Sequence, residues 1–261
     1  MGVMRAHVLA LLSFAACGDD ASKPSIALVH GAWETSNAWE PVSAKLAADG
    51  YRVVSIDLPG RPGNPLDPSA VTLAGYAEAV EAGIATLPKP VVLVGHSFGG
   101  ITISTVAAAQ PETVETLVYV AAFIPRDGKS VLDLAKEDTS SALPPHLQID
   151  LVAGLATVDP SSSGALFAND GTAAQQAAVA AALVSEPLGA LNTPVAVPAS
   201  FAGLDKVYIK TLRDQVVTPG AQTAMIGTTQ VRATFELDTG HLPFVTEPDG
   251  LTAAIERAIW R

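Results

Sequence analysis

Short apolar runs alternate along this chain with longer segments in which apolar residues recur every three or four positions. The short runs are rich in Val and Ile and are nearly continuous, which is typical of strands buried on both faces of a parallel sheet. Six strands are predicted on this basis: Ser25–Val29, Arg52–Ile56, 91–94, Val114–Val120, Lys206–Thr211 and 231–237.

Helical periodicity fills most of the segments between these runs. One apolar stripe begins at Trp39 and ends at Gly50, a residue that commonly terminates helices. A second begins after Thr72, a candidate N-cap, and ends before Pro88. Alternation of strand and helix predicts a doubly wound α/β sheet that is mainly parallel. Two further helices are predicted at 98–110 and 251–259.

The alternation is interrupted in the segment 124–200, which is rich in Ala, Ser and Pro. It contains a helix-like stretch at 173–184 but no clear strand, and it is too long for a loop in a compact domain. We therefore predict one α/β domain over residues 25–261, with a helical cap inserted at about 124–200.

The first residues have the features of an export signal. Arg5 precedes a short apolar stretch that ends in small residues directly before Cys17. We predict a signal peptide at 1–16 and a linker at 17–24. The arrangement resembles a bacterial lipoprotein signal, which implies lipidation of Cys17 and anchoring to the cell envelope. The alternative is an ordinary signal that leaves a periplasmic or secreted protein.

The amino-acid composition argues against several classes of function. The net charge is −11, with 15 basic and 26 acidic residues and no basic run, which argues against nucleic-acid binding and docking on anionic lipid. Membrane contact is expected only through the lipid anchor. The lone cysteine cannot form an intramolecular disulfide, and the five histidines lack paired metal-ligand spacing. No metal and no cofactor are expected.

The segment from Gly95 to Gly99 reads Gly-His-Ser-Phe-Gly, follows a predicted strand and opens a predicted helix. In that context G-x-S-x-G is a nucleophile elbow, which raises a serine hydroxyl above the carboxyl end of the sheet. The flanking glycines allow the tight turn and close backbone approach. We predict Ser97 as the nucleophile, and His96 as an orienting or packing residue.

An acid and a base follow in the order that this arrangement requires. Asp214 and His241 lie just after the last two predicted strands, at the edge where such a sheet gathers its site. Asp205 precedes its strand and so lies at the wrong end. Asp238 is only three residues from His241. We therefore predict the triad Ser97, Asp214 and His241.

The first strand ends at His30-Gly31, the position of the loop that completes an oxyanion hole in α/β-hydrolases. The second donor comes from the residue after the nucleophile. The predicted donors are the backbone N–H groups of Ala32 and Phe98.

Several segments together resemble the plant methylesterase and hydroxynitrile lyase branch of the α/β-hydrolases: VHGAW, TLAGYAEAV, VLVGHSFGG, VYVAAFIP and GHLPFVTEP. The resemblance covers roughly residues 24–260 and is weakest in the cap. Members of that branch are mostly esterases of small esters, and a few are cyanohydrin lyases. The resemblance implies a serine esterase without a cofactor, acting on a small-molecule ester.

Two other functions are possible on this fold. In the lyases a threonine follows the loop histidine and a lysine follows the catalytic histidine, whereas this chain has Gly31 and Leu242. A non-catalytic binding protein is also possible, because hydrolase folds host such proteins. The complete triad favours an enzyme.

The cap sequence bears on the charge of the substrate. No lysine or arginine occurs between Lys136 and Lys206, so the roof of the pocket is predicted to lack a cationic partner for a carboxylate. Arg126 and Lys129 are the nearest exceptions. We expect small or medium esters that are neutral and largely apolar.

Overall fold

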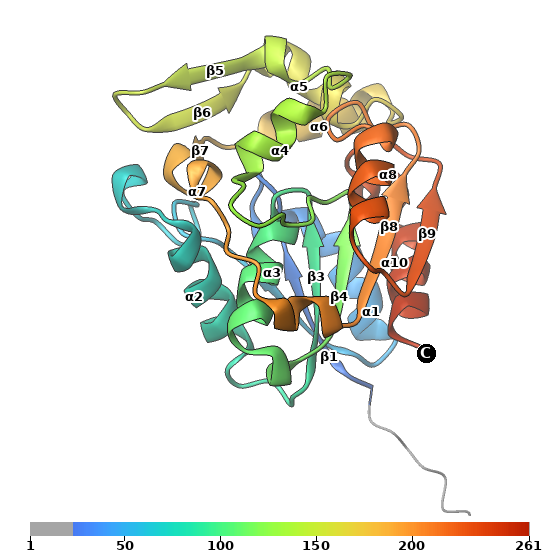
Figure 1. Cartoon of the computed structure of the whole chain (residues 1–261). Helices are drawn as coiled ribbons and strands as arrows, with labels where there is room; N and C mark the ends of the chain where they lie inside the picture. Colours follow the sequence, from blue (N-terminus) through green and yellow to red (C-terminus); the bar gives the residue numbers. More distant parts are fainter. Residues whose placement is uncertain (1–22, 261) are drawn as a thin grey trace, which may run out of the picture.

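The computed structural model describes residues 23–260, and its centre is a six-stranded sheet in the order β2-β1-β3-β4-β8-β9 (Figure 1). Every neighbouring pair is parallel. The predicted α/β fold is confirmed, and the strands differ from prediction only at two ends, in β3 and β9. Their bounds are β1 Ser25–Val29, β2 Arg52–Ile56, β3 Val91–His96, β4 Val114–Val120, β8 Lys206–Thr211 and β9 Ala233–Leu237.

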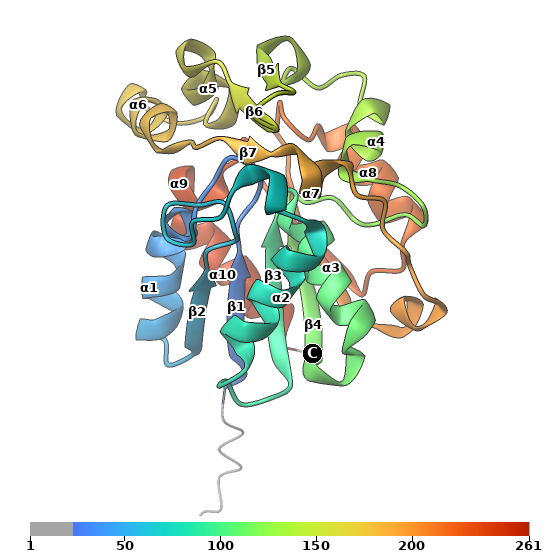
Figure 2. The same ribbon diagram turned by 90° about the vertical axis from the view of Figure 1, so that its left-hand side faces the viewer.

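Helices cover both faces of this sheet, as a doubly wound fold requires. Helices α2 and α3 pack together against β1, while α1 and α10 pack together and contact the strands from the other side (Figures 1 and 2). The helices outside the cap are α1 Glu40–Ala48, α2 Leu73–Ile84, α3 Gly99–Ala109, α8 Pro219–Thr228, α9 Pro243–Thr246 and α10 Pro248–Ile259. Single 3₁₀ turns occur at Ser36–Trp39, Pro68–Ala70, Pro111–Thr113, Pro144–His146 and Ala199–Gly203.

Two helix ends follow directly from local chemistry. The Thr72 hydroxyl accepts a hydrogen bond from the amide of Gly75 at 3.0 Å, so Thr72 is the N-cap of α2. Gly50 lies just beyond α1 with a φ of +90°, a backbone conformation that side-chain-bearing residues rarely adopt.

The cap lies over the carboxyl ends of the central strands (Figures 1 and 2). It contains four helices, and it also contains a separate antiparallel sheet of β5, β6 and β7 that was not predicted. Two of these strands have four residues and the third has two, which is too short to give a clear apolar pattern. The cap elements are α4 Val131–Glu137, β5 Leu147–Asp150, β6 Leu155–Val158, α5 Pro160–Phe167, α6 Ala173–Ala182, β7 Glu186–Pro187 and α7 Leu188–Asn192.

The predicted signal peptide and Cys17 lie outside the described residues. Across residues 23–260, we find no helix with the length and apolar character needed to cross a membrane.

Candidate active site

Ser97 occupies a strained turn between β3 and α3, with a φ of +50°. A Cβ on Gly95 would lie 2.6 Å from the carbonyl oxygen of Gly99, and a Cβ on Gly99 would lie 2.7 Å from that of His30. Only glycine fits at either position, which explains the spacing of the motif. The turn is tied to the next strand, because the Ser97 amide donates to the Val120 carbonyl at 3.1 Å.

Asp214 and His241 are in direct contact. The His241 Nδ1–H group donates to Asp214 Oδ2 at 2.7 Å, and both side chains are buried. The Asp214 carboxylate is held in turn by the amides of Val216 and Val217, at 2.8 and 3.0 Å from Oδ1. With its proton on Nδ1, His241 presents Nε2 as a proton acceptor.

Two polar side chains that the sequence analysis missed also hold this carboxylate. The Thr211 hydroxyl donates to Asp214 Oδ2 at 3.0 Å, and the Gln222 amide group lies 3.3 Å from the same oxygen. Gln222 is wholly buried on α8. Nothing in its sequence context distinguishes it from other polar helix residues, so only the folded structure identifies it.

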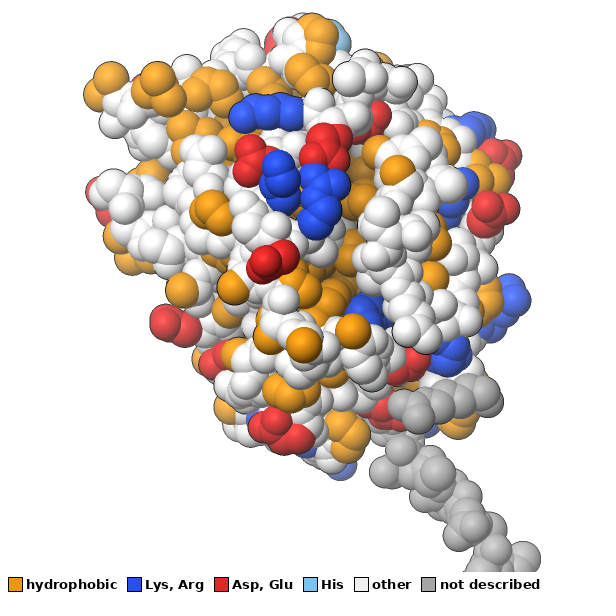
Figure 3. Space-filling view, viewed as in Figure 1, with side chains coloured by type: hydrophobic (Ala, Val, Ile, Leu, Met, Phe, Trp, Pro, Cys, Tyr) orange, Lys and Arg blue, Asp and Glu red, His pale blue; other side chains and the backbone are white. Residues whose placement is uncertain are grey.

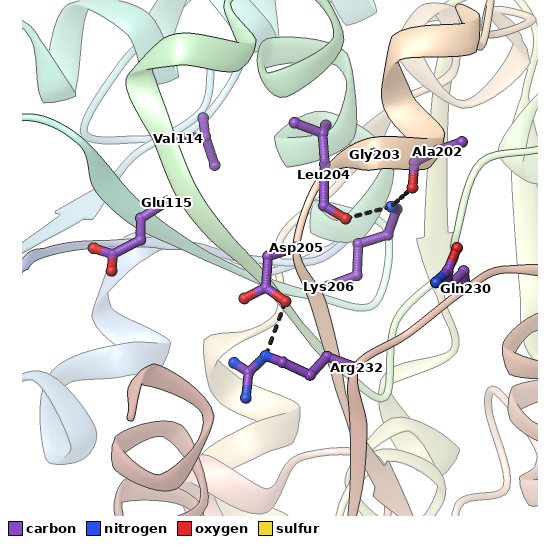
Figure 4. A pocket seen from close by; sticks show the side chains of 9 residues that line it. All are labelled: Val114, Glu115, Ala202, Gly203, Leu204, Asp205, Lys206, Gln230 and Arg232. Carbon is purple, nitrogen blue, oxygen red and sulfur yellow. Dashed lines mark hydrogen bonds and ion pairs between the residues drawn. The ribbon is translucent and has the colours of Figure 1, made fainter. Parts of the chain in front are cut away.

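The two rival acids lie elsewhere. Asp205 is at the opposite end of the sheet, where it accepts a hydrogen bond from Arg232 (Figure 4) and another from Thr116. Asp238 has a side chain that is 77% exposed and pairs with Arg213. Of the three candidate acids, the structure brings only Asp214 to His241.

The loop after His30 lies between two buried carboxylates. The Gly31 amide donates to Glu34 Oε2 at 2.7 Å, and the Trp33 amide donates to Glu186 Oε2 at 2.9 Å. Among the hydrogen bonds within residues 23–260, the intervening amide of Ala32 has no acceptor and so is available to a ligand. This is the amide that the sequence predicts as an oxyanion donor.

Glu186 comes from the cap, and no sequence motif marks it as part of the site. Its carboxylate pairs with Arg61 and accepts a hydrogen bond from the Tyr76 hydroxyl at 2.8 Å, all three side chains being buried. Burial raises the pKa of Glu186, whereas the positive charge of Arg61 opposes that rise. The pair joins residues 125 positions apart, which no local pattern can indicate.

His30 is held as a neutral imidazole beneath this loop. The Leu58 amide donates to its Nε2 at 3.2 Å, and its Nδ1–H group lies 2.8 Å from the Gly31 carbonyl oxygen. Burial, together with the nearby Arg61, lowers the pKa of His30 to about 4. His30 is therefore a structural support of the loop, and it is not placed to exchange protons near neutral pH.

His96 lies between Glu34 and the His241 loop. Its Nδ1 is 3.0 Å from the Glu34 carboxylate, and its Nε2–H group donates to the carbonyl oxygen of His241 at 2.9 Å. The His96 and His241 rings pack with centroids 4.6 Å apart. Since His96 directly precedes Ser97, this packing brings the His241 loop to the elbow.

A cavity of about 210 Å³ opens above Ser97. Its walls are almost wholly apolar, with side chains from the elbow, the loop after β4, α4 and α7. Lys136 lines this cavity, which corrects the expectation that Arg126 or Lys129 would be the nearest cation.

Arg126 instead pairs with Glu137 beside a neighbouring hollow of about 260 Å³. On that face basic and acidic side chains are interleaved (Figure 3).

Comparison with known proteins agrees with this geometry. Residues 26–254 match the alpha/beta hydrolase family, so the chain belongs to that family. Methylesterase 18 of Arabidopsis thaliana is 27% identical over 254 residues, covering 88% of this chain and 95% of the relative. A carbendazim hydrolyzing esterase of Nocardioides is 34% identical over 129 residues, which is 49% of this chain and 52% of that enzyme.

Solved structures give the same picture. The crystal structure of a novel pyrethroid hydrolase from Sphingobium faniae superimposes with a TM-score of 0.77 at 25% identity, covering 90% of this chain and 97% of that one. An Arabidopsis methylesterase structure, at 20% identity and a TM-score of 0.76, shows the shared fold. Within the alpha/beta hydrolases, the relatives that match this chain include several Arabidopsis methylesterases at 26–28% identity. The chain spans 68%, 63% and 68% of the length of three longer chloroplastic methylesterases of Arabidopsis.

Proposed function

We propose that this chain is a serine hydrolase that cleaves carboxylic esters through an acyl-enzyme, with Ser97, Asp214 and His241 as the triad. The observation that carries the proposal is the buried His241–Asp214 hydrogen bond of 2.7 Å, next to a strained elbow at Ser97 whose preceding residue, His96, packs its ring against that of His241. The esterase names of several relatives support the same reaction class.

In this mechanism His241 takes the Ser97 proton through Nε2 as the serine attacks the ester carbonyl. Asp214 holds the imidazole in the required tautomer and stabilises the imidazolium that forms. The amides of Ala32 and Phe98 stabilise the oxyanion of the tetrahedral intermediate. The alcohol leaves with the proton from His241, and water then releases the acyl group by the same route.

The loop geometry favours hydrolysis over the lyase reaction. A Cβ on Gly31 would lie 2.9 Å from both Ser97 Cβ and His96 Nδ1, so the threonine of the lyases would require neighbouring atoms to move. Leu242, at the position of the lyase lysine, is buried and apolar. Neither residue offers a group that could hold cyanide.

A fluorophosphonate probe separates the enzyme from a non-catalytic binding protein. We expect stoichiometric covalent labelling of the wild-type protein together with loss of hydrolysis of an activated neutral ester. Absence of both labelling and hydrolysis in the folded protein would show that the pocket binds without turnover.

Neutral esters are the proposed substrates, because the cavity above Ser97 is lined mainly by apolar side chains. For two esters of matched size, one ending in methyl and one in carboxylate, we expect kcat/KM to favour the methyl form by about tenfold or more, since a carboxylate loses hydration in this cavity and meets a single cationic side chain among the lining residues, the exposed Lys136. Lys136 is exposed at this cavity, and Lys136→Gln should widen the preference. Preference for the carboxylate ester would show that a cation reaches the bound acyl or alcohol group.

We also propose export and lipid anchoring at Cys17, on the strength of the sequence alone. Several acyl chains would give stable membrane attachment, at about 0.8 kcal/mol for each buried methylene. Metabolic labelling with an alkynyl fatty acid should mark the wild type and not Cys17→Ser. Equal labelling or equal membrane retention of the two proteins would exclude the anchor.

A further inference from the structure

Three catalytic segments meet at one buried pair of side chains, Glu34 and His96. Glu34 Oε2 accepts the Gly31 amide at 2.7 Å, which orients the oxyanion loop. His96 Nδ1 lies 3.0 Å from both carboxylate oxygens of Glu34, and its Nε2–H group donates to the His241 carbonyl at 2.9 Å. Oxyanion loop, elbow and catalytic-histidine loop are thus linked through two side chains.

We infer that Glu34 and His96 form a carboxylate–imidazolium pair that positions the Ala32 amide and His241 relative to Ser97. Both nitrogens of the His96 ring face oxygen acceptors, one a carboxylate and one a carbonyl. A ring with protons on both nitrogens satisfies both contacts, and only the imidazolium has two. The inference rests on the proposed hydrolase function.

The surroundings of the pair keep it away from water. The side chains of His96 and Glu34 are 0% and 3% exposed, and the rings of Trp39 and Phe244 pack edge-on against His96. Burial by itself would lower the pKa of His96, but the charge and hydrogen bond of Glu34, the His241 carbonyl and the charge of Asp214 together outweigh it, so the pKa is raised. Burial by itself would raise the pKa of Glu34, but the charge and hydrogen bond of His96, with the Gly31 amide and His241, together lower it. Two buried opposite charges in contact stabilise each other, whereas removal of either leaves the other uncompensated.

The effect on catalysis follows from which groups are held. Glu34 bonds the amide next to Ala32, so it fixes the direction of an N–H group that is needed most when charge develops on the substrate oxygen. His96 bonds the backbone of the base itself. Such contacts stabilise the transition state more than they stabilise bound substrate. Removing them is therefore expected to lower kcat and to leave KM nearly unchanged.

The first experiment measures kcat and KM for Glu34→Gln, His96→Gln and the double variant. We expect each single change to lower kcat between about 10-fold and 100-fold, less than the 100- to 1000-fold typical of a deleted oxyanion donor, with KM changed less than threefold. Since the residues act as one unit, the double variant should be no slower than the slower single variant. The inference would be overturned if the fall in kcat of the double variant equalled the product of the two single falls. It would also be overturned if the variants changed KM alone.

Asp205→Asn is the matched control, because it breaks a partly buried ion pair with Arg232 at the opposite end of the sheet. It should reduce thermal stability while leaving kcat within twofold of wild type. A similar loss of kcat in this control would show that the Gln variants act through general destabilisation.

The second experiment needs no variant and no activity. In ¹⁵N-histidine NMR spectra of the wild-type protein at pH 7, the His96 ring, assigned by contacts to Phe244 and Trp39, should carry protons on both nitrogens. A neutral His96 ring would overturn the charged pair. Because this result is independent of turnover, it separates failure of the inference from failure of the proposed function.

Discussion

Ser97→Ala is expected to reduce kcat for ester hydrolysis by about a million-fold, the loss seen when the nucleophile of a serine protease is removed. The change deletes one hydroxyl at a position that is only 6% exposed, and it leaves the backbone bonds of the elbow in place. The midpoint of thermal unfolding should therefore move by no more than about 2–4 °C, the effect of about 1 kcal/mol in a domain of this size. Rates on an activated ester and a thermal melt provide the measurement.

Ser104→Ala is the matched control for that experiment. Ser104 is also buried, on the helix that follows the elbow, and its hydroxyl contacts the Gly100 carbonyl at 2.6 Å and the Tyr119 hydroxyl at 2.7 Å. This variant should lose stability but keep both its activity and its fluorophosphonate labelling. If the Ser97→Ala protein retained more than about 1% of the wild-type rate, Ser97 would not be the nucleophile.

Asp214→Asn is expected to lower kcat by about ten-thousand-fold, as the equivalent change does in a serine protease. The Val216 and Val217 amides already donate to Oδ1, so an asparagine would place its carbonyl oxygen there and turn its NH₂ group toward His241. That group would donate to Nδ1 and favour the tautomer with its proton on Nε2. His241 would then be unable to accept the Ser97 proton.

The comparison variant is Asp238→Asn, three residues from His241 in the chain. Its carboxylate is largely exposed and pairs with Arg213, an interaction worth about 0–1 kcal/mol in such positions. Activity should stay within twofold of wild type. If Asp238→Asn were the more damaging change, the acid of the triad would be Asp238.

The positions of the main strands along the chain, and all but two of their ends, could be predicted from the sequence. Strands β1, β3, β4 and β8 are buried on both faces, and this burial imposes a nearly continuous apolar run. The elbow could be found for a similar reason. Gly95 and Gly99 are needed within one turn, where a Cβ would collide with backbone atoms. The positions of Asp214 and His241 follow from the rule that parallel strands present their carboxyl ends at one edge.

The cap was harder to predict. Its three short strands are stabilised by one another rather than by a long apolar pattern, so the sequence indicated only a helical insertion. Lys136 was not identified as a neighbour of the pocket, because its place depends on how α4 packs over the sheet.

The sequence by itself therefore determined the α/β fold and the elbow serine, since these depend on local periodicity and on steric limits within a few residues, while the resemblance of several segments indicated the family. Only the tertiary structure decided which charges support the site. Glu186 meets Arg61 across 125 positions, and Glu34 meets His96 across 62, in surroundings from which water is excluded. Such pairs leave no periodic signal, because a charged residue is tolerated in a core only where the fold brings it an opposite charge.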